Sequence, residues 1–140
     1  MRLLIDTNIV LDVMLDRAPH AGVAAQVLSL VDSGRIDGAL CGTSVTTIHY
    51  VAARTVGEKR AAALVKELLQ IFEIAQVDRQ TLMSAAGLGF ADFEDAVIHE
   101  AASAWGASGI VTRDKTGFQQ ATLPVFNAHE LLSALVAGGD

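Results

Sequence analysis

The chain has 140 residues, of which 51% are apolar and 19% charged, so we expect a single domain over residues 1–140 with its own core. Many alanines and few aromatic residues favour packed helices over a β-sandwich. The single cysteine, Cys41, which we expect in the core, excludes a disulfide framework and a cysteine-based zinc site. Ten basic against sixteen acidic residues give a formal charge of −6, which argues against a broad basic groove for duplex nucleic acid.

Short apolar runs alternate with helical periodicity along the chain. We predict a strand over 2–5, helices over 9–14 and 20–33, a strand over 38–41, helices over 43–52 and 58–72, and a strand over 73–77. Helices over 79–86 and 92–105, strands over 109–112 and 123–126, and a helix over 128–137 follow. This order predicts an α/β fold with a parallel, three-layer arrangement, whose sites lie beyond the carboxyl ends of the strands.

The N-terminal segment has no signal-peptide layout, and no apolar run reaches the roughly 18 residues needed to cross a bilayer. We therefore expect a cytoplasmic protein.

Aspartates stand at the ends of elements that such a fold would bring together. Asp6 follows the first strand, Asp114 follows the strand over 109–112, and the helix leading into that strand begins with Asp92 and Asp95. If the two strands are neighbours, these carboxylates face one crevice, where repulsion and desolvation disfavour their charged forms. A divalent cation would hold them ionised together, and ligands that are all oxygen favour Mg²⁺ or Mn²⁺.

Each of these acids also has a purely structural interpretation. Asp6 and Asp92 can cap the helices that follow them, and Asp114 can be a turn residue. Because the three positions fall at strand ends expected to be adjacent, we favour the shared site.

Other polar residues on the helices are expected to be structural. Asp12 and Asp16, four residues apart, are typical of a solvated helix face. His99 lies on the same helical face as Asp95 and is either a donor to that carboxylate or, more simply, a histidine satisfied by its neighbours.

Three segments of the chain resemble the signatures of the PIN-domain family, in the right order and spacing. They are residues 4–12 (LIDTNIVLD), 92–96 (DFEDA) and 110–118 (IVTRDKTGF). The length is similar to that of stand-alone members, many of which are VapC-like toxins of toxin–antitoxin modules. The resemblance implies a Rossmann-like parallel sheet of order 3-2-1-4-5 flanked by helices. It also implies an Mg²⁺- or Mn²⁺-dependent ribonuclease, frequently a homodimer, that is held inactive by an antitoxin.

The resemblance also implies roles for individual residues. Asp6, Asp95 and Asp114 would be the catalytic, metal-binding carboxylates, and Asp92 would be an additional metal ligand. Side chains that hold these acids or a bound water in place would be Asn8, Thr47 and Thr112.

One departure from the family concerns the helix after the second strand, where members usually carry an acid. Residues 43–53 contain none, and the best alignment puts Thr47 in that position. A threonine can hydrogen-bond a metal-bound water but brings no charge. The site would then hold one fewer negative charge. This lowers its affinity for a metal ion, and for a second metal ion in particular.

Basic residues beside the acids are candidate contacts to RNA phosphates. Arg113 and Lys115 flank Asp114, and a second cluster contains Arg54, Lys59 and Arg60. We expect Arg113 and Lys115 to bind substrate.

Two functions remain open on the sequence. The first is a nuclease that hydrolyses phosphodiester bonds of single-stranded RNA. The second is a PIN module that is weakly catalytic and binds RNA or a protein partner without cleavage. A haloacid-dehalogenase-like phosphatase is disfavoured because the residue two after Asp6 is Asn8 rather than an aspartate, and a phosphoreceiver is disfavoured because no aspartate lies near residue 50.

Overall fold

The structure, a computed structural model, describes residues 1–138. The strands are β1 (Arg2–Ile5), β2 (Asp37–Cys41), β3 (Glu73–Ala75), β4 (Gly109–Val111) and β5 (Val125–Phe126). The helices are α1 (Thr7–Met14), α2 (Ala21–Asp32), α3 (Gly42–Val56), α4 (Glu58–Ile71), α5 (Arg79–Ala86), α6 (Phe93–Trp105) and α7 (Ala128–Ala137), with one 3₁₀ helix, η1 (Lys115–Phe118). Every strand and helix expected from the sequence is present, and η1 is an addition.

The five strands form one parallel sheet in the order β3-β2-β1-β4-β5, which confirms the predicted α/β architecture. The central strand, β1, pairs Leu4 with Ala39 of β2 on one side and with Ile110 of β4 on the other. The shortest strands, β3 and β5, lie at the two edges, and Pro124 directly precedes β5, where an edge tolerates its missing amide proton. Strands β1 and β4 are therefore neighbours, as the carboxylate hypothesis required.

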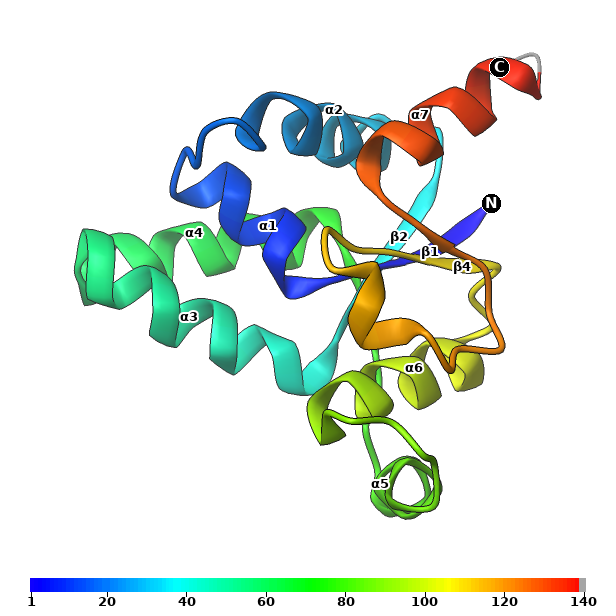
Figure 1. Cartoon of the computed structure of the whole chain (residues 1–140). Helices are drawn as coiled ribbons and strands as arrows, with labels where there is room; N and C mark the ends of the chain where they lie inside the picture. Colours follow the sequence, from blue (N-terminus) through cyan, green and yellow to red (C-terminus); the bar gives the residue numbers. More distant parts are fainter. Residues whose placement is uncertain (139–140) are drawn as a thin grey trace.

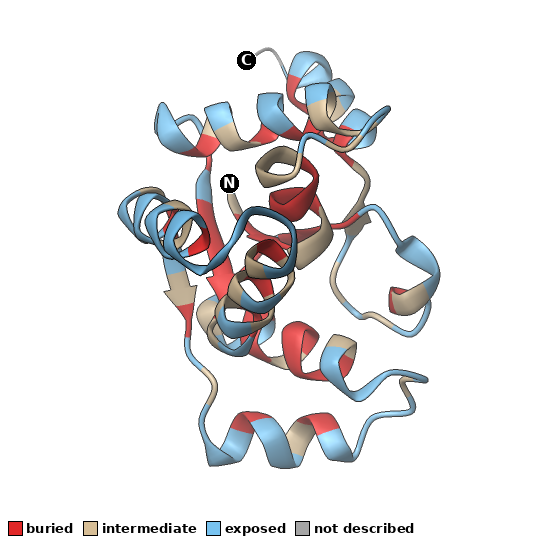
Figure 2. Ribbon diagram, turned by 90° about the vertical axis from the view of Figure 1, so that its left-hand side faces the viewer, coloured by how far each residue is buried: buried red, intermediate tan, exposed pale blue. Residues whose placement is uncertain are grey.

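Helices cover both faces of the sheet (Figure 1). Helices α1, α2, α3, α4 and α7 pack on one face, and α5 and α6 pack on the other. Successive residues of β1 serve the two layers alternately, since Leu3 and Ile5 belong to the first core and Leu4 to the second. Burial is concentrated in the strands and on the inward faces of the helices (Figure 2).

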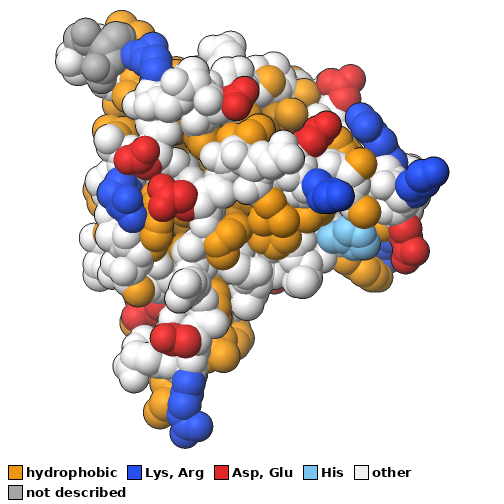
Figure 3. All heavy atoms as spheres, turned by 180° about the vertical axis from the view of Figure 1, so that it is seen from behind, with side chains coloured by type: hydrophobic (Ala, Val, Ile, Leu, Met, Phe, Trp, Pro, Cys, Tyr) orange, Lys and Arg blue, Asp and Glu red, His pale blue; other side chains and the backbone are white. Residues whose placement is uncertain are grey.

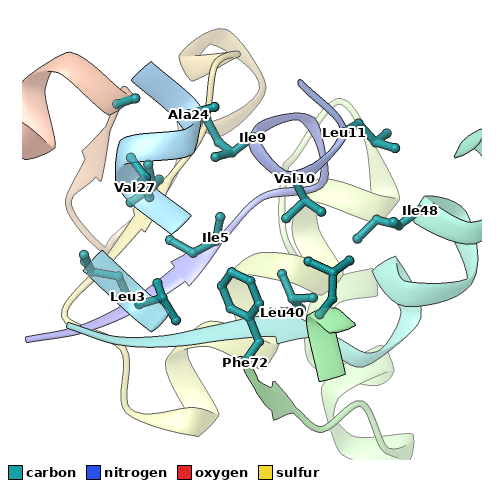
Figure 4. Packing of buried hydrophobic residues seen from close by; sticks show 14 of the residues in the cluster. Leu3, Ile5, Ile9, Val10, Leu11, Ala24, Val27, Leu40, Ile48 and Phe72 are labelled. Atoms are coloured by element: carbon teal, nitrogen blue, oxygen red, sulfur yellow. The ribbon is translucent and has the colours of Figure 1, made fainter. Parts of the chain in front are cut away.

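The first core fills the space between the sheet and the five-helix layer (Figure 4). Ile5 from β1, Leu40 from β2 and Ile48 from α3 are all fully buried there, and Phe72 closes the core where α4 leads into β3. Each such side chain contributes roughly 1.5–3 kcal/mol by leaving water. Cys41 is buried in the second core, as expected of a small core residue. In the described part of the chain, no helix combines the length and apolar character needed to span a membrane.

Candidate active site

The candidate site begins where β1 and β4 end side by side. Ile5 and Val111 are register partners, and the backbone amide of the next residue, Asp6, donates to the carbonyl of Val111 at 2.9 Å. Asp6 and Thr112 consequently leave the sheet as neighbours. Asp6 also caps α1, because its Oδ1 accepts from the amide of Thr7 at 2.8 Å. The capping role proposed for Asp6 is real and does not exclude a role in the site.

Thr112, which is fully buried, connects the polar residues at this edge. Its hydroxyl donates to Asp6 Oδ2 at 2.8 Å and accepts from Asn8 Nδ2 at 3.3 Å and from the amide of Asp114 at 3.1 Å. Asn8 Oδ1 accepts from the amide of Arg113 at 3.1 Å. These bonds fix the direction of the Asp6 carboxylate and the path of the chain toward Asp114, so Asn8 and Thr112 lie where supporting residues were expected.

Besides Asp6 and Asp114, acidic residues at the start of α6 contribute to the site. Asp92 caps the helix by accepting from the amide of Asp95 at 3.1 Å. All four predicted carboxylates, together with two charged residues that the sequence did not single out, line one pocket of about 270 Å³. Its lining residues are Asp6, Thr7, Asn8, Leu11, Arg17, Asp92, Glu94, Asp95, Asp114 and Phe118.

The carboxylates in this pocket perturb one another. Burial, followed by the charges of Asp6, Asp92, Asp114 and Glu94, raises the pKa of Asp95 to about 7. Burial also raises the pKa of Asp6 against the opposing effect of its hydrogen bonds, and burial followed by the charge of Asp92 raises that of Glu94. Carboxylates that disfavour one another's ionisation in a shared pocket are typical of functional sites.

Gly117 allows two of the carboxylates to converge. A Cβ atom at this position would lie 2.5 Å from Asp95 Oδ2 and 3.6 Å from Asp114 Oδ2. Asp95 Oδ2 therefore occupies space that a side chain at position 117 would fill, and Asp114 Oδ2 lies at ordinary contact distance from the same point. Gly117 belongs to η1.

The donor set suits a hard divalent cation in its chemistry. Every acidic ligand offers oxygen, and the hydroxyl of Thr7, which also lines the pocket, is buried with no hydrogen-bond partner in the described residues. As the side chains stand, however, no three His, Cys, Asp or Glu residues within 1–138 are arranged to hold one ion together. The residues fit the ion by type and charge, but not by the arrangement of their side chains in this structure.

Thr47 is not among the residues that line the pocket. It is half-buried in α3, and no residue of that helix reaches the pocket wall. The role predicted for Thr47 therefore stays a prediction, and the acids of the pocket come from the residue after β1, the start of α6 and the segment after β4.

The prediction that Asp12 lies on a solvated face is wrong, although Asp16 is exposed as expected. The Asp12 side chain is fully buried and accepts from Arg113 Nε at 2.8 Å and Nη2 at 3.1 Å. The periodicity of α1 did not reveal this because the partner that makes burial of a charge tolerable stands 101 residues away.

Both basic residues predicted to bind substrate are paired with carboxylates outside the pocket, and their contact with substrate stays a prediction. Arg113 donates to Asp12, and Lys115 Nζ lies 3.0 Å and 3.1 Å from the two oxygens of Glu130 in α7. These contacts of Arg113 and Lys115 stabilise the loop around Asp114.

The second basic cluster, Arg54, Lys59 and Arg60, is exposed where α3 meets α4. Several Lys and Arg side chains gather on the right in Figure 3. His99 is buried and satisfied, with Nδ1 2.8 Å from Glu100 Oε2 and Nε2 accepting from the amide of Thr122 at 3.1 Å. The simpler interpretation of His99 is therefore confirmed.

Glu94 and Arg17 are the charged pocket residues that sequence reasoning missed. Glu94 had a signal, because it stands between Asp92 and Asp95 in the first turn of a helix that points at the site. Arg17 had none, since it lies in the turn after α1 and reaches the pocket only through the tertiary structure. A larger cavity of about 760 Å³ between β3, α5 and α6 contains none of the predicted site residues.

A protein-family model described as a PIN domain matches residues 2–116 of the chain. No curated protein matches it. One similar solved structure is VapBC2 from Rickettsia felis, which is bound to a promoter DNA fragment. It superposes with a TM-score of 0.69 at 18% sequence identity, and the match covers 91% of this chain and 98% of the other chain. A toxin–antitoxin complex from Klebsiella pneumoniae gives 0.69 at 21% identity, over 91% and 98%. VapC20 from Mycobacterium tuberculosis, a sarcin–ricin loop cleaving toxin, gives 0.66 at 12% identity, over 81% and 90%.

Proposed function

Because the chain belongs to the PIN domain family, we propose that it is a ribonuclease that uses Mg²⁺ or Mn²⁺ to hydrolyse phosphodiester bonds of single-stranded RNA. The observation that carries the proposal is the pocket that gathers Asp6, Asp95 and Asp114 at the carboxyl edge of β1 and β4. These three residues would hold the cation, with Asp92 as a further ligand.

The chain's own residues have distinct tasks in this proposal. A bound divalent cation would supply Lewis-acid activation of water and neutralisation of the developing charge. Thr112 fixes one oxygen of Asp6 by hydrogen bonding, and the amide of Thr7 fixes the other. Thr116 donates to Asp114 Oδ1 at 2.7 Å, which orients that carboxylate. Carboxylates held in this way lose less conformational entropy when they bind an ion.

A toxin–antitoxin module is the proposed biological setting. The support comes from the structural neighbours, which include a toxin–antitoxin complex and a toxin that cleaves the sarcin–ricin loop. We propose a cognate antitoxin as a protein partner, a homodimer as the active assembly, and the cytoplasm as the location. A small reading frame adjacent to the gene, whose product co-purifies with the chain and inhibits it, is the expected finding.

An RNA cleavage assay tests the enzymatic proposal. The purified protein should cut an end-labelled RNA in Mg²⁺ or Mn²⁺ and stop cutting in EDTA. Asp6→Asn and Asp114→Asn should be inactive, whereas Glu67→Gln, which removes an exposed acid of α4, should cut like the wild type. Equal cleavage by the aspartate variants would contradict the assignment and indicate a contaminating nuclease.

A second candidate function is a PIN module that binds RNA or a protein without cutting. Two observations favour it: Thr47 stands where the family usually has an acid, and no three ligands within residues 1–138 are placed to share an ion. Calorimetric titration with Mn²⁺ discriminates between the functions. Heat of binding that Asp114→Asn abolishes supports the nuclease, and an absence of heat together with retained RNA binding supports the alternative.

A further inference from the structure

The carboxylate pocket presents an electrostatic difficulty to its proposed substrate. Five acids line it, and a phosphodiester is itself an anion, so the approach of RNA is repelled wherever the acids remain ionised. Among the described lining residues one side chain is basic, that of Arg17. A guanidinium in the wall is the feature that an anionic ligand needs, because it supplies charge-assisted hydrogen bonds at the point of entry.

The backbone at the end of α1 brings Arg17 to this position. Asp16 adopts a left-handed conformation with φ of 49°, and its amide donates to the carbonyl of Val13 at 3.3 Å. The amide of Arg17 donates to the carbonyl of Asp12 at 3.0 Å. Together these bonds form a Schellman motif, in which glycine is the usual left-handed residue. The motif turns the chain back on the helix, so that Arg17 lies against Asp12 and reaches the pocket that begins at the other end of α1.

The guanidinium of Arg17 lies beside the Asp12 carboxylate but donates no hydrogen bond to it. Its Nη1 lies 3.6 Å from Asp12 Oδ1, beyond hydrogen-bonding distance, and the two Asp12 oxygens already accept from Arg113. Within residues 1–138 the structure gives the Arg17 guanidinium this ion pair and no hydrogen bond, and its side chain is 36% exposed. The donors of Arg113 and Lys115, in contrast, are directed at carboxylates.

We infer that Arg17 binds a phosphate of the single-stranded RNA at the mouth of the carboxylate pocket, positioned by the buried carboxylate of Asp12, which Arg113 holds in place. The inference rests on the proposed function, whose substrate class it accepts, and adds the residue that recognises the substrate backbone. A planar guanidinium matches two phosphate oxygens at once, whereas an ammonium group acts as a point charge. Arg17→Lys should therefore keep part of the RNA affinity that Arg17→Ala loses.

The experiment measures binding separately from cleavage. A fluorescein-labelled 12-nucleotide oligouridylate is titrated with the full chain in EDTA, and fluorescence anisotropy gives the dissociation constant at several salt concentrations. Arg17→Ala should weaken binding about tenfold or more, since hydrogen bonds to charged groups are worth about 1.5–3 kcal/mol. The slope of log affinity against log salt should fall by about 0.7, the value for one phosphate contact on a single strand. Arg17→Gln keeps a polar side chain but removes its charge, and it should reduce the salt slope by the same amount. This variant replaces Arg17→Ala if the alanine variant unfolds.

Arg79→Ala is the matched control, because Arg79 is an exposed arginine of α5 outside the pocket lining. It should leave both the dissociation constant and the salt slope unchanged. If Arg17→Ala and Arg17→Gln bind as the wild type does while the wild type cleaves RNA in Mn²⁺, the role of Arg17 is overturned and the nuclease stands. If the wild type neither binds nor cleaves RNA, the proposed function fails and the inference fails with it.

Discussion

The buried carboxylate of Asp12 and the guanidinium of Arg113 form a bidentate pair, with hydrogen bonds of 2.8 Å and 3.1 Å, although they stand 101 residues apart. Arg113 also donates its backbone amide to Asn8, so both ends of the residue bind the first turns of α1. The next residue along the chain is Asp114. The pair therefore fastens the loop that carries one candidate metal ligand to the helix that follows another, Asp6.

Loss of this pair should destabilise the fold asymmetrically. Arg113→Ala leaves the buried Asp12 carboxylate with only its 3.6 Å ion pair to Arg17, and we expect the free energy of unfolding to fall by about 2–4 kcal/mol. Asp12→Asn should cost less, about 1–2 kcal/mol, because the Arg113 side chain is 38% exposed and water can solvate it. Urea denaturation measures both, with Arg79→Ala as the surface control. The reverse order of the two losses would contradict this account.

Asp95 should make stability depend on pH. Its folded-state pKa of about 7 lies above its ordinary value of 3.8, so folding takes up a proton between about pH 4 and pH 7. The free energy of unfolding should consequently fall as pH rises through this range in EDTA, and the buried Asp6, whose pKa is also raised, acts in the same direction. Asp95→Asn should flatten the profile and stabilise the protein at pH 8 by about 1–2 kcal/mol, after allowance for solvent screening of a half-buried carboxyl. Thermal melts of the wild type and Asp95→Asn at pH 5 and pH 8 measure this. An equal change in Tm between the two pH values for both proteins would contradict the prediction.

Addition of Mn²⁺ should reverse that destabilisation, because a bound cation favours the ionised carboxylates. At tenfold excess over its dissociation constant the ion should stabilise the fold by about 1.4 kcal/mol, a rise in Tm of roughly 3–6 °C. Asp114→Asn should lose the rise and Glu67→Gln should keep it. Equal rises in all three proteins would show that the ion binds elsewhere.

Gly117→Ala should separate the geometry of the site from the stability of the fold. The added methyl would meet Asp95 Oδ2 at 2.5 Å, and the end of that side chain can swing away at little cost. We expect the free energy of unfolding to change by less than about 1 kcal/mol, whereas the Mn²⁺-induced rise in Tm should shrink, because Asp95 and Asp114 no longer converge. An unaltered response to Mn²⁺ would mean that convergence over Gly117 is not required.

The sequence alone was enough to predict the elements and the position of the acids. Alternation of apolar runs with helical periodicity predicted each strand and α-helix, because burial of one face leaves a local pattern. The acids could be located for the same local reason: Asp6 and Asp114 follow strands directly, and the carboxyl ends of parallel strands meet at one edge. The sheet order itself came from the resemblance of three short segments to a family, and the hydrogen-bonded strand pairs confirm it.

Charge pairing, in contrast, was decided by the tertiary structure. Nothing local distinguishes Asp12, which is buried against Arg113, from Asp16, which faces solvent four residues later. Nor did any pattern indicate that Arg113 and Lys115 would be engaged by carboxylates while Arg17 lines the pocket. Periodicity reports which side of a helix is covered, but the free energy of a buried charge depends on the partner that covers it, and that partner is chosen only when distant segments pack together.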